Sequence, residues 1–200
     1  INNITIYAND SFGNKNSKYY RFNITIDNPP VLSLDSPKNN SVIKGDTTLN
    51  FTVSDNSLDS VWYYLDGERK TDFIGTYDIK LQRSQEGNIW LNYSANDTKG
   101  QKATKKYFFE VDNTKPNLTI YDPENITYSE EEIWINYTSS DKNLENTTYS
   151  LNSGSNISIN TNTTINPPEG FNALEMYAND SAGNIIYKKV FFSKDVTSPN

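Results

Sequence analysis

Three nearly identical segments divide the chain into repeats. They read YANDSFGN at residues 7–14, SANDTKGQ at 94–101 and YANDSAGN at 177–184. A strand-like run, an Asp and a proline follow each of them, and the prolines are Pro30, Pro116 and Pro199. Self-similarity at one spacing is the signature of a tandem array, so the chain is built from a unit of about 85 residues.

The spacing predicts three segments. Residues 1–28 match only the last two strands of a unit, whereas residues 29–114 and 115–200 each form a complete unit. A two-strand hairpin is marginally stable alone in water. We therefore expect an upstream part of a longer chain to supply its missing strands, with another subunit as the alternative. The end at Pro199-Asn200, another linker start, predicts that more repeats follow.

Each unit alternates between apolar and polar residues, and no long window has a helical period. Hydrophobic residues make up only 34% of the chain, but 14 Tyr, 9 Phe and 3 Trp can fill small cores. The 29 Asn residues favour turns. The pattern predicts an all-β fold of tandem immunoglobulin-like β-sandwich domains, with about seven strands each, plus the N-terminal two-strand partial unit. The chain has no Cys, so these domains are expected to share the immunoglobulin-like arrangement of strands but not the disulfide of antibody domains.

The repeated motif predicts a hairpin turn. Before it, Ile4, Ile6 and Ala8 share one parity and are expected to face a sandwich core. At the strand end, an Asp precedes a Gly by three residues, which suits a carboxylate that accepts turn N–H groups and a Gly with positive φ. The alternative is that these Asp residues bind Ca²⁺. We favour the turn, because one carboxylate followed by small residues has too few oxygens for Ca²⁺. The residues are Asp10, Asp97 and Asp180, followed by Gly13, Gly100 and Gly183.

Potential N-glycosylation triplets, N-x-[ST] without proline at x, are frequent. About six would arise by chance in a chain so rich in Asn, Ser and Thr. Those in strands have the opposite parity to the apolar residues, which places the Asn on the solvent face, where a glycan can stand. Several recur at matched repeat positions. We predict N-glycosylation at many of the fourteen: Asn3, Asn9, Asn23, Asn39, Asn50, Asn92, Asn96, Asn117, Asn125, Asn136, Asn146, Asn156, Asn162 and Asn179.

Glycosylation implies an extracellular or cell-surface protein. The charge and the residue types of the chain argue against nucleic-acid binding, membrane spanning and catalysis. The net charge of −7 comes without a basic cluster, which disfavours nucleic-acid binding. No apolar run approaches the roughly 20 residues that span a bilayer. The chain has neither His nor Cys, the commonest general base and nucleophile. We therefore predict no enzymatic activity, no catalytic residues and no cofactor.

The linkers between units offer another possible site. The segments IDNPP at 26–30 and VDNTKP at 111–116 are similar to cadherin junctions, where Asp and Asn bind Ca²⁺ between domains. Asp27 and Asp112 are the candidate ligands, with Asn28 and Asn113 beside them. We favour a short, proline-stiffened hinge over calcium, because the other acidic motifs of cadherins are absent.

The tryptophans raise the possibility of sugar stacking. Trp90 and Trp134 have outward parity in their strands, and Trp62 lies in an earlier strand of the first unit. One exposed aromatic residue per unit is ordinary for a folded protein. We therefore interpret them as surface or inter-domain packing residues.

The segments YANDSAGN (177–184) and VFFSKDVTSP (190–199) together resemble the Ig-like repeats of archaeal, and some bacterial, surface-layer and adhesion proteins. The resemblance implies a secreted or wall-anchored glycoprotein without catalysis. We predict a structural protein that self-associates with neighbouring copies or domains into a surface layer or extracellular filament. The alternative is an adhesin or receptor stalk that binds a protein or carbohydrate partner.

Overall fold

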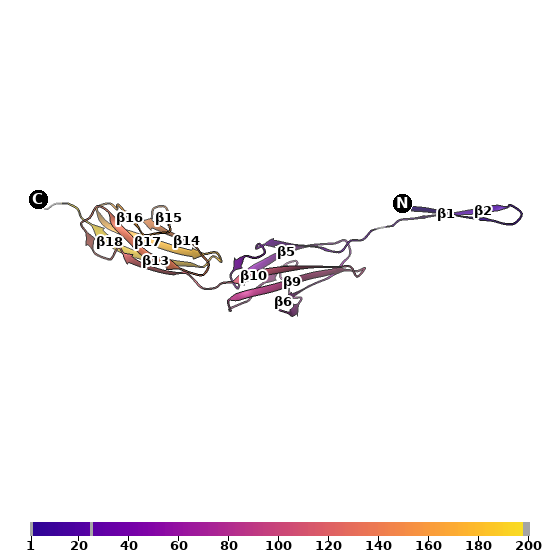
Figure 1. The fold of residues 1–200 in the computed structure, drawn as a ribbon, viewed down its shortest axis with the longest axis horizontal. Coiled ribbons are helices and arrows are strands. Elements are labelled where there is room, and N and C mark those ends of the chain that lie inside the picture. The colour runs from indigo at the N-terminus through magenta and orange to yellow at the C-terminus, as the bar shows by residue number, and fades with distance from the viewer. Residues whose placement is uncertain (1, 25, 198–200) are drawn as a thin grey trace.

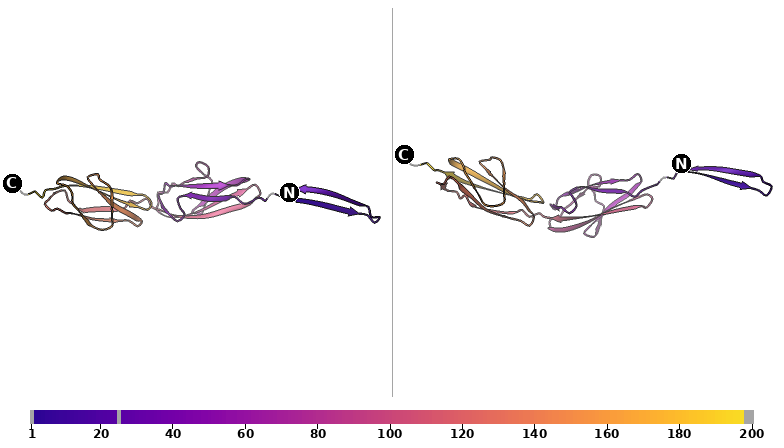
Figure 2. Two further views of the ribbon diagram at one scale, coloured as in Figure 1. Left: turned by 90° about the horizontal axis from the view of Figure 1, so that it is seen from above. Right: turned by 45° about the horizontal axis from the view of Figure 1, so that its top comes forward.

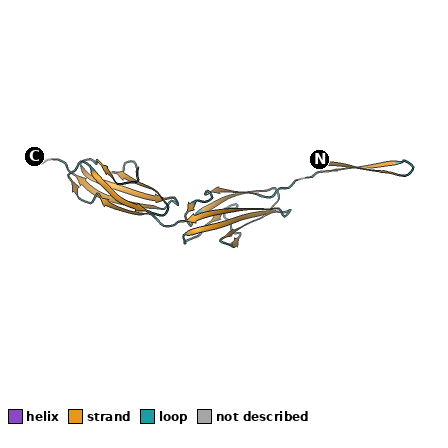
Figure 3. Cartoon of the chain, in the orientation of Figure 1, coloured by secondary structure: helices purple, strands orange, loops and turns teal. Residues whose placement is uncertain are grey.

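The computed structural model describes residues 2–24 and 26–197. These residues form strands, turns and loops, and none of them forms a helix that is long and apolar enough to cross a membrane. A hairpin and two β-sandwiches follow one another along an extended chain (Figures 1 and 2). The prediction of an all-β fold with tandem Ig-like sandwiches and a two-strand partial unit is confirmed (Figure 3). Pro199, predicted to mark a third boundary, lies outside the described residues.

The N-terminal hairpin is an isolated two-stranded sheet. Strands β1 (Asn2–Asn9) and β2 (Lys15–Phe22) pair antiparallel, and every residue in them is exposed. The prediction that Ile4, Ile6 and Ala8 face a core is therefore wrong for this chain as it stands. The alternation is present, but no second sheet among the described residues covers the apolar face.

The first sandwich consists of two sheets. One has the order β3-β5-β8 and the other the order β4-β10-β9-β6-β7. The strands of the smaller sheet are β3 (Val31–Ser36), β5 (Thr48–Ser54) and β8 (Ile79–Lys80). Those of the larger sheet are β4 (Val42–Ile43), β6 (Leu58–Leu65), β7 (Glu68–Lys70), β9 (Gly87–Asp97) and β10 (Lys102–Val111).

The second sandwich repeats this topology, with the orders β11-β13-β16 and β12-β18-β17-β14-β15. Its smaller sheet contains β11 (Asn117–Asp122), β13 (Ile133–Ser140) and β16 (Thr163–Ile165). Its larger sheet contains β12 (Thr127–Tyr128), β14 (Leu144–Leu151), β15 (Ile157–Ile159), β17 (Gly170–Asp180) and β18 (Ile185–Lys194). Each unit begins with two short segments in different sheets, β3 and β4 or β11 and β12, because the chain crosses from one sheet to the other.

The core lies between the sheets, where alternate side chains of the long central strand meet the facing sheet. In β9, Leu91, Tyr93 and Ala95 are fully buried, as the alternation predicts. The ring of Tyr93 stacks on that of Phe51 from the opposite sheet, with centroids 4.0 Å apart. Burial of a large apolar side chain contributes roughly 1.5–3 kcal/mol, so these aromatic contacts offset the low apolar content of the chain. The second core is built in the same way around Leu174, Met176 and Ala178.

Two adjacent phenylalanines on β18 test this division between core and surface. Phe192 is 1% exposed and contacts Tyr128, whereas Phe191 is 41% exposed and stacks on Phe171. We expect Phe192→Ala to lower the free energy of unfolding of the second sandwich by about 3–5 kcal/mol, because it leaves a cavity. Phe191→Ala is the control and should cost about 1 kcal/mol, the value of a surface aromatic pair. Hydrogen exchange of the β17 amides measures both, and equal losses would contradict the assigned core.

Candidate functional site at the unit junctions

The repeated motif forms a tight hairpin turn closed by its Asp. In the first sandwich, Oδ1 of Asp97 accepts the backbone N–H groups of Lys99 and Gln101, both at 2.8 Å. Gly100 has a φ of 81°, a conformation that Gly adopts without strain. The other two copies form the same turn, with Asp10 and Gly13 in one and Asp180 and Gly183 in the other. The turn prediction is therefore confirmed.

The turn also places Asp97 beside two other carboxylates at the end of the first sandwich. Asp27 reaches this point from the linker after the hairpin, and Asp55 from the loop after β5. One carboxylate oxygen of each lies within 4.8 Å of the other two. The Ser57 hydroxyl donates to Asp27 at 3.1 Å, and the Ser57 N–H donates to Asp55 at 2.7 Å. We call Asp27, Asp55 and Asp97 the first triad.

The first triad concentrates negative charge in a partly enclosed place. Asp97 is 1% exposed, and its Oδ2 has no hydrogen-bond partner among the described residues. None of the ion pairs within the described residues includes a member of the triad. Two unit charges at this separation repel by about 3 kcal/mol at the effective dielectric constant of a protein surface. A cleft of about 190 Å³, lined by Asp27 and Asp55 among others, adjoins the triad.

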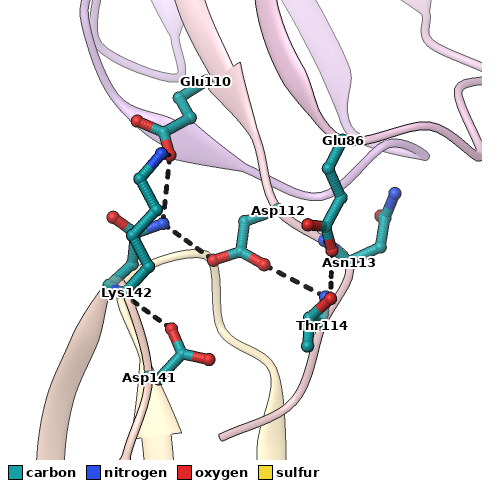
Figure 4. Close-up of polar contacts among 8 residues, drawn as sticks. Glu86, Glu110, Asp112, Asn113, Thr114, Asp141 and Lys142 are labelled. Atoms are coloured by element: carbon teal, nitrogen blue, oxygen red, sulfur yellow. Dashed lines mark hydrogen bonds and ion pairs between the residues drawn. The ribbon is translucent and has the colours of Figure 1, made fainter.

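The junction between the two sandwiches contains an equivalent set. Asp112 from the linker, Asp141 from the loop after β13 and Asp180 from the turn also bring one oxygen each within 4.8 Å of the others. We call these residues the second triad. Here the Asn143 side-chain amide donates to Asp112 at 2.8 Å, and that of Asn184 donates to Asp180 at 2.8 Å. Figure 4 shows the polar contacts around Asp112 and Asp141.

An ion pair also crosses the second junction. Lys142, from the second sandwich, pairs with Glu110 on β10 of the first (Figure 4). Lys142, and after it the Asn143 amide, lower the pKa of the Glu110 carboxyl, and Glu110 raises the pKa of the Lys142 ammonium. The adjoining cleft has a volume of about 590 Å³ and includes Glu86, which accepts a hydrogen bond from the Thr114 hydroxyl. These contacts connect the two sandwiches through side chains as well as through the linker.

The structure places the linker candidates differently from one another. Asp27 and Asp112 join the triads, whereas Asn113 hydrogen-bonds to Gly45 N–H and to the Arg83 carbonyl, which fastens the linker to the first sandwich. At the corresponding place after β18, Asp195 accepts the Thr197 N–H and hydroxyl, which lowers the pKa of its carboxyl.

Two members of the triads, Asp55 and Asp141, are not predicted as ligands by the sequence. Asp55 and Asp141 occupy matched positions in the two repeats, and each accepts the N–H two residues further on. Their recurrence was the available signal. The turn alone has too few oxygens for calcium, but the fold brings carboxylates from three chain segments to the same strand end.

The glycosylation triplets all have their Asn within the described residues, and none of these Asn residues is buried. Eight are exposed: Asn3, Asn9, Asn23, Asn39, Asn117, Asn125, Asn156 and Asn162. Six are half-buried: Asn50, Asn92, Asn96, Asn136, Asn146 and Asn179. By contrast, Asn172 and Asn184 are buried, and neither belongs to a triplet.

The tryptophans do not form a repeated site. Trp90 and Trp134 are 62% and 58% exposed, in agreement with their outward parity. Trp90 packs against Phe108 across β9 and β10, but Ala173 takes the equivalent place opposite Phe191 in the second sandwich. Trp62 is half-buried and lies beneath Arg69 and Lys102. The acidic triads recur in both units with the same residue types, whereas the aromatic pair on this surface changes from Trp90–Phe108 to Phe171–Phe191.

Comparison with protein families matches residues 30–152 to the family described as Bacterial Ig domain. Among solved structures, the fibronectin(III)-like modules of Clostridium thermocellum CbhA share 16% identity with a TM-score of 0.58, over 82% of this chain and 94% of that chain. Sidekick-1 immunoglobulin domains 1–5 share 15% identity with a TM-score of 0.48, over 94% of this chain and 46% of that chain. No curated protein matches the chain.

The turn aspartate of the exposed hairpin should titrate at an unusually low pH. The Asn14 side-chain amide and backbone N–H lower the pKa of Asp10 from its ordinary value of 3.8. A lowered pKa means that these hydrogen bonds stabilise the turn above pH 3.8 and that this contribution is lost as the pH falls through the folded value. Asn14→Ala should raise the pKa of Asp10 measured by NMR titration. Asn16→Ala, which removes a nearby exposed amide outside the turn, should leave it unchanged, and equal effects would contradict the assignment.

Proposed function

Because the chain belongs to the bacterial Ig domain family, we propose that it is a non-catalytic structural segment of an extracellular, N-glycosylated surface protein that forms a surface layer or filament. Ig-like and fibronectin-like domains are typically non-catalytic. The chain also lacks His and Cys, the commonest general base and nucleophile.

The placement of the glycosylation triplets carries the proposal. A glycan needs an Asn side chain that reaches solvent, and all fourteen triplet Asn residues are exposed or half-buried. Matched members of the two units, such as Asn39 and Asn125, are both exposed. Glycans at these places would hydrate the sandwich surfaces and shield strand edges from pairing with other chains.

The arrangement of the units supports a structural role. The units follow one another lengthwise through short linkers (Figure 1), and the second junction is fixed by the Lys142–Glu110 pair and by the Asn143 amide. A short linker with side-chain contacts on both sides restricts bending. Neighbouring copies or domains of the same protein are the proposed partners.

An adhesin or receptor stalk is the second candidate, and the exposed Trp90–Phe108 pair favours it. An exposed tryptophan can stack on a sugar or anchor a protein partner. If this function is correct, the chain should stay monomeric at high concentration and bind a carbohydrate or protein ligand, and Trp90→Ala should abolish that binding.

Intact mass before and after deglycosylation of the protein from its native source tests the proposal. We expect the mass to fall by many glycan masses on deglycosylation, because fourteen triplets are available for attachment. Occupancy should be highest at the exposed Asn residues whose Nδ2 donates no hydrogen bond within the described part of the chain. These are Asn3, Asn9, Asn23, Asn39, Asn117, Asn125 and Asn156.

Triplet Asn residues whose side-chain amide already donates a hydrogen bond are the internal control for occupancy. Nδ2 of Asn136 donates to Asp122 and that of Asn179 donates to Glu145, so attachment there would break a hydrogen bond. Peptide mapping should find these sites less occupied than Asn125 and Asn117. A mass that does not change on deglycosylation would remove the main support for an exported, glycan-coated protein.

Self-assembly separates the two candidate functions. A structural segment should sediment as oligomers at high concentration and form sheets or filaments visible by electron microscopy. If the hairpin donates its strands to a neighbouring copy, deletion of residues 1–28 should abolish this assembly, because the exposed apolar face of β1 and β2 would be lost. Unchanged assembly after the deletion would argue against strand donation, and no assembly by the full chain would favour the adhesin.

A further inference from the structure

We propose that the first triad, Asp27, Asp55 and Asp97, binds a calcium ion between the N-terminal hairpin and the first sandwich. The proposal is independent of glycosylation and of assembly. The three residues come from the linker, from the loop after β5 and from the turn after β9. One oxygen of each lies within 4.8 Å of the others, a separation that a single cation can bridge.

The unpartnered oxygen of Asp97 points to a ligand. Oδ1 of Asp97 already accepts two turn N–H groups, so the turn does not need Oδ2. Oδ2 is buried, and no group among the described residues donates to it. Buried carboxylates are ordinarily paired, hydrogen-bonded or bound to a metal. A cation shared with Asp27 and Asp55 would supply the missing partner.

In the second triad, side-chain amides donate hydrogen bonds to the carboxylates, so no ion is needed to pair with these oxygens. There the Asn184 amide donates to Asp180 Oδ2, and the Asn143 amide donates to Asp112. The equivalent residues at the first junction are Gln101 and Ser57. Ser57 has a single hydroxyl hydrogen, and Gln101 contributes only its backbone N–H to Asp97. At the first triad, therefore, no side-chain amide among the described residues donates to the three carboxylates.

The chemistry of the site favours calcium among the common cations. Three carboxylates are hard oxygen ligands, and the chain has no His or Cys for zinc. Calcium accepts six to eight oxygens in an irregular shell and commonly keeps waters, which the adjoining cleft of about 190 Å³ can hold. Magnesium requires a near-ideal octahedron and is usually held by only one or two carboxylates and several waters, so a set of three carboxylates favours calcium.

Calcium at this place would fix the preceding hairpin relative to the sandwich. The Ser57 hydroxyl contact to Asp27 is the hydrogen bond that links this linker carboxylate to the sandwich in the described residues. An ion bound by Asp27 on one side and by Asp55 and Asp97 on the other would stiffen the linker, as side chains do at the second junction.

A calcium titration of the ¹⁵N-labelled full chain, freed of metals with a chelator, tests the proposal. The reporters are the backbone amides of Ser57, Lys99 and Gln101, which donate to the triad. We expect saturable shifts with a Kd on the order of 10⁻⁴–10⁻³ M, the range of extracellular calcium modules. Asp27→Asn and Asp55→Asn should each weaken binding about tenfold or more, because each removes a charged ligand. Magnesium that bound as tightly as calcium would overturn the choice of ion.

Asp59→Asn is the matched control. Asp59 is an exposed carboxylate near the same end of the sandwich, and its contact with the Asn96 amide needs only one oxygen. It should leave the Kd nearly unchanged, because isolated surface charges are strongly screened. Asp27→Asn lies in the linker and alters no turn hydrogen bond, so it remains informative if Asp55→Asn fails to fold. The proposal is overturned if the reporters do not shift in about 10 mM calcium, or if Asp59→Asn weakens binding as much as Asp27→Asn.

Discussion

The hydrogen bonds between a buried aspartate and the turn that follows it determine the geometry at one end of each sandwich. Asp97 and Asp180 hold the turns between the two longest strands of each unit, β9–β10 and β17–β18. Asp10 forms the same turn in the exposed hairpin, whereas in the two sandwiches this carboxylate is buried at the end of the sandwich where the preceding linker arrives. The same residue therefore closes a hairpin and places a negative charge at the junction between units.

Different groups donate hydrogen bonds to the carboxylates at the two junctions. At the second junction, Asn143 and Asn184 donate amide hydrogens to the carboxylates, and Lys142 pairs with Glu110 nearby. At the first junction, Ser57 and Gln101 stand in the places of these amides. The repeat thus preserves the three carboxylates while the groups that satisfy them vary. The second triad accepts side-chain amide hydrogens, whereas among the described residues the first triad accepts only backbone N–H groups and the Ser57 hydroxyl.

Much of the fold followed from local patterns. Alternation along residues 89–93 predicts which side chains of β9 are buried, because successive side chains of a strand point to opposite faces. The Asp and Gly of the repeated motif predict the turn, since both act within a few residues. The same alternation was misleading at Ile4 and Ile6, which remain exposed. Parity tells which residues share a face, but burial requires a second sheet to cover that face.

The sequence by itself determined the repeat, the strand-rich character of each unit, the turn aspartates and the solvent-facing glycosylation triplets. These depend on spacing and on period-two alternation, which are local properties of the chain. Only the tertiary structure decided that Asp27, Asp55 and Asp97 meet, and that Asp112, Asp141 and Asp180 meet in the same way. The members of each triad lie far apart in sequence, and they converge because two sheets, a linker and a turn bring three chain segments to one end of a sandwich.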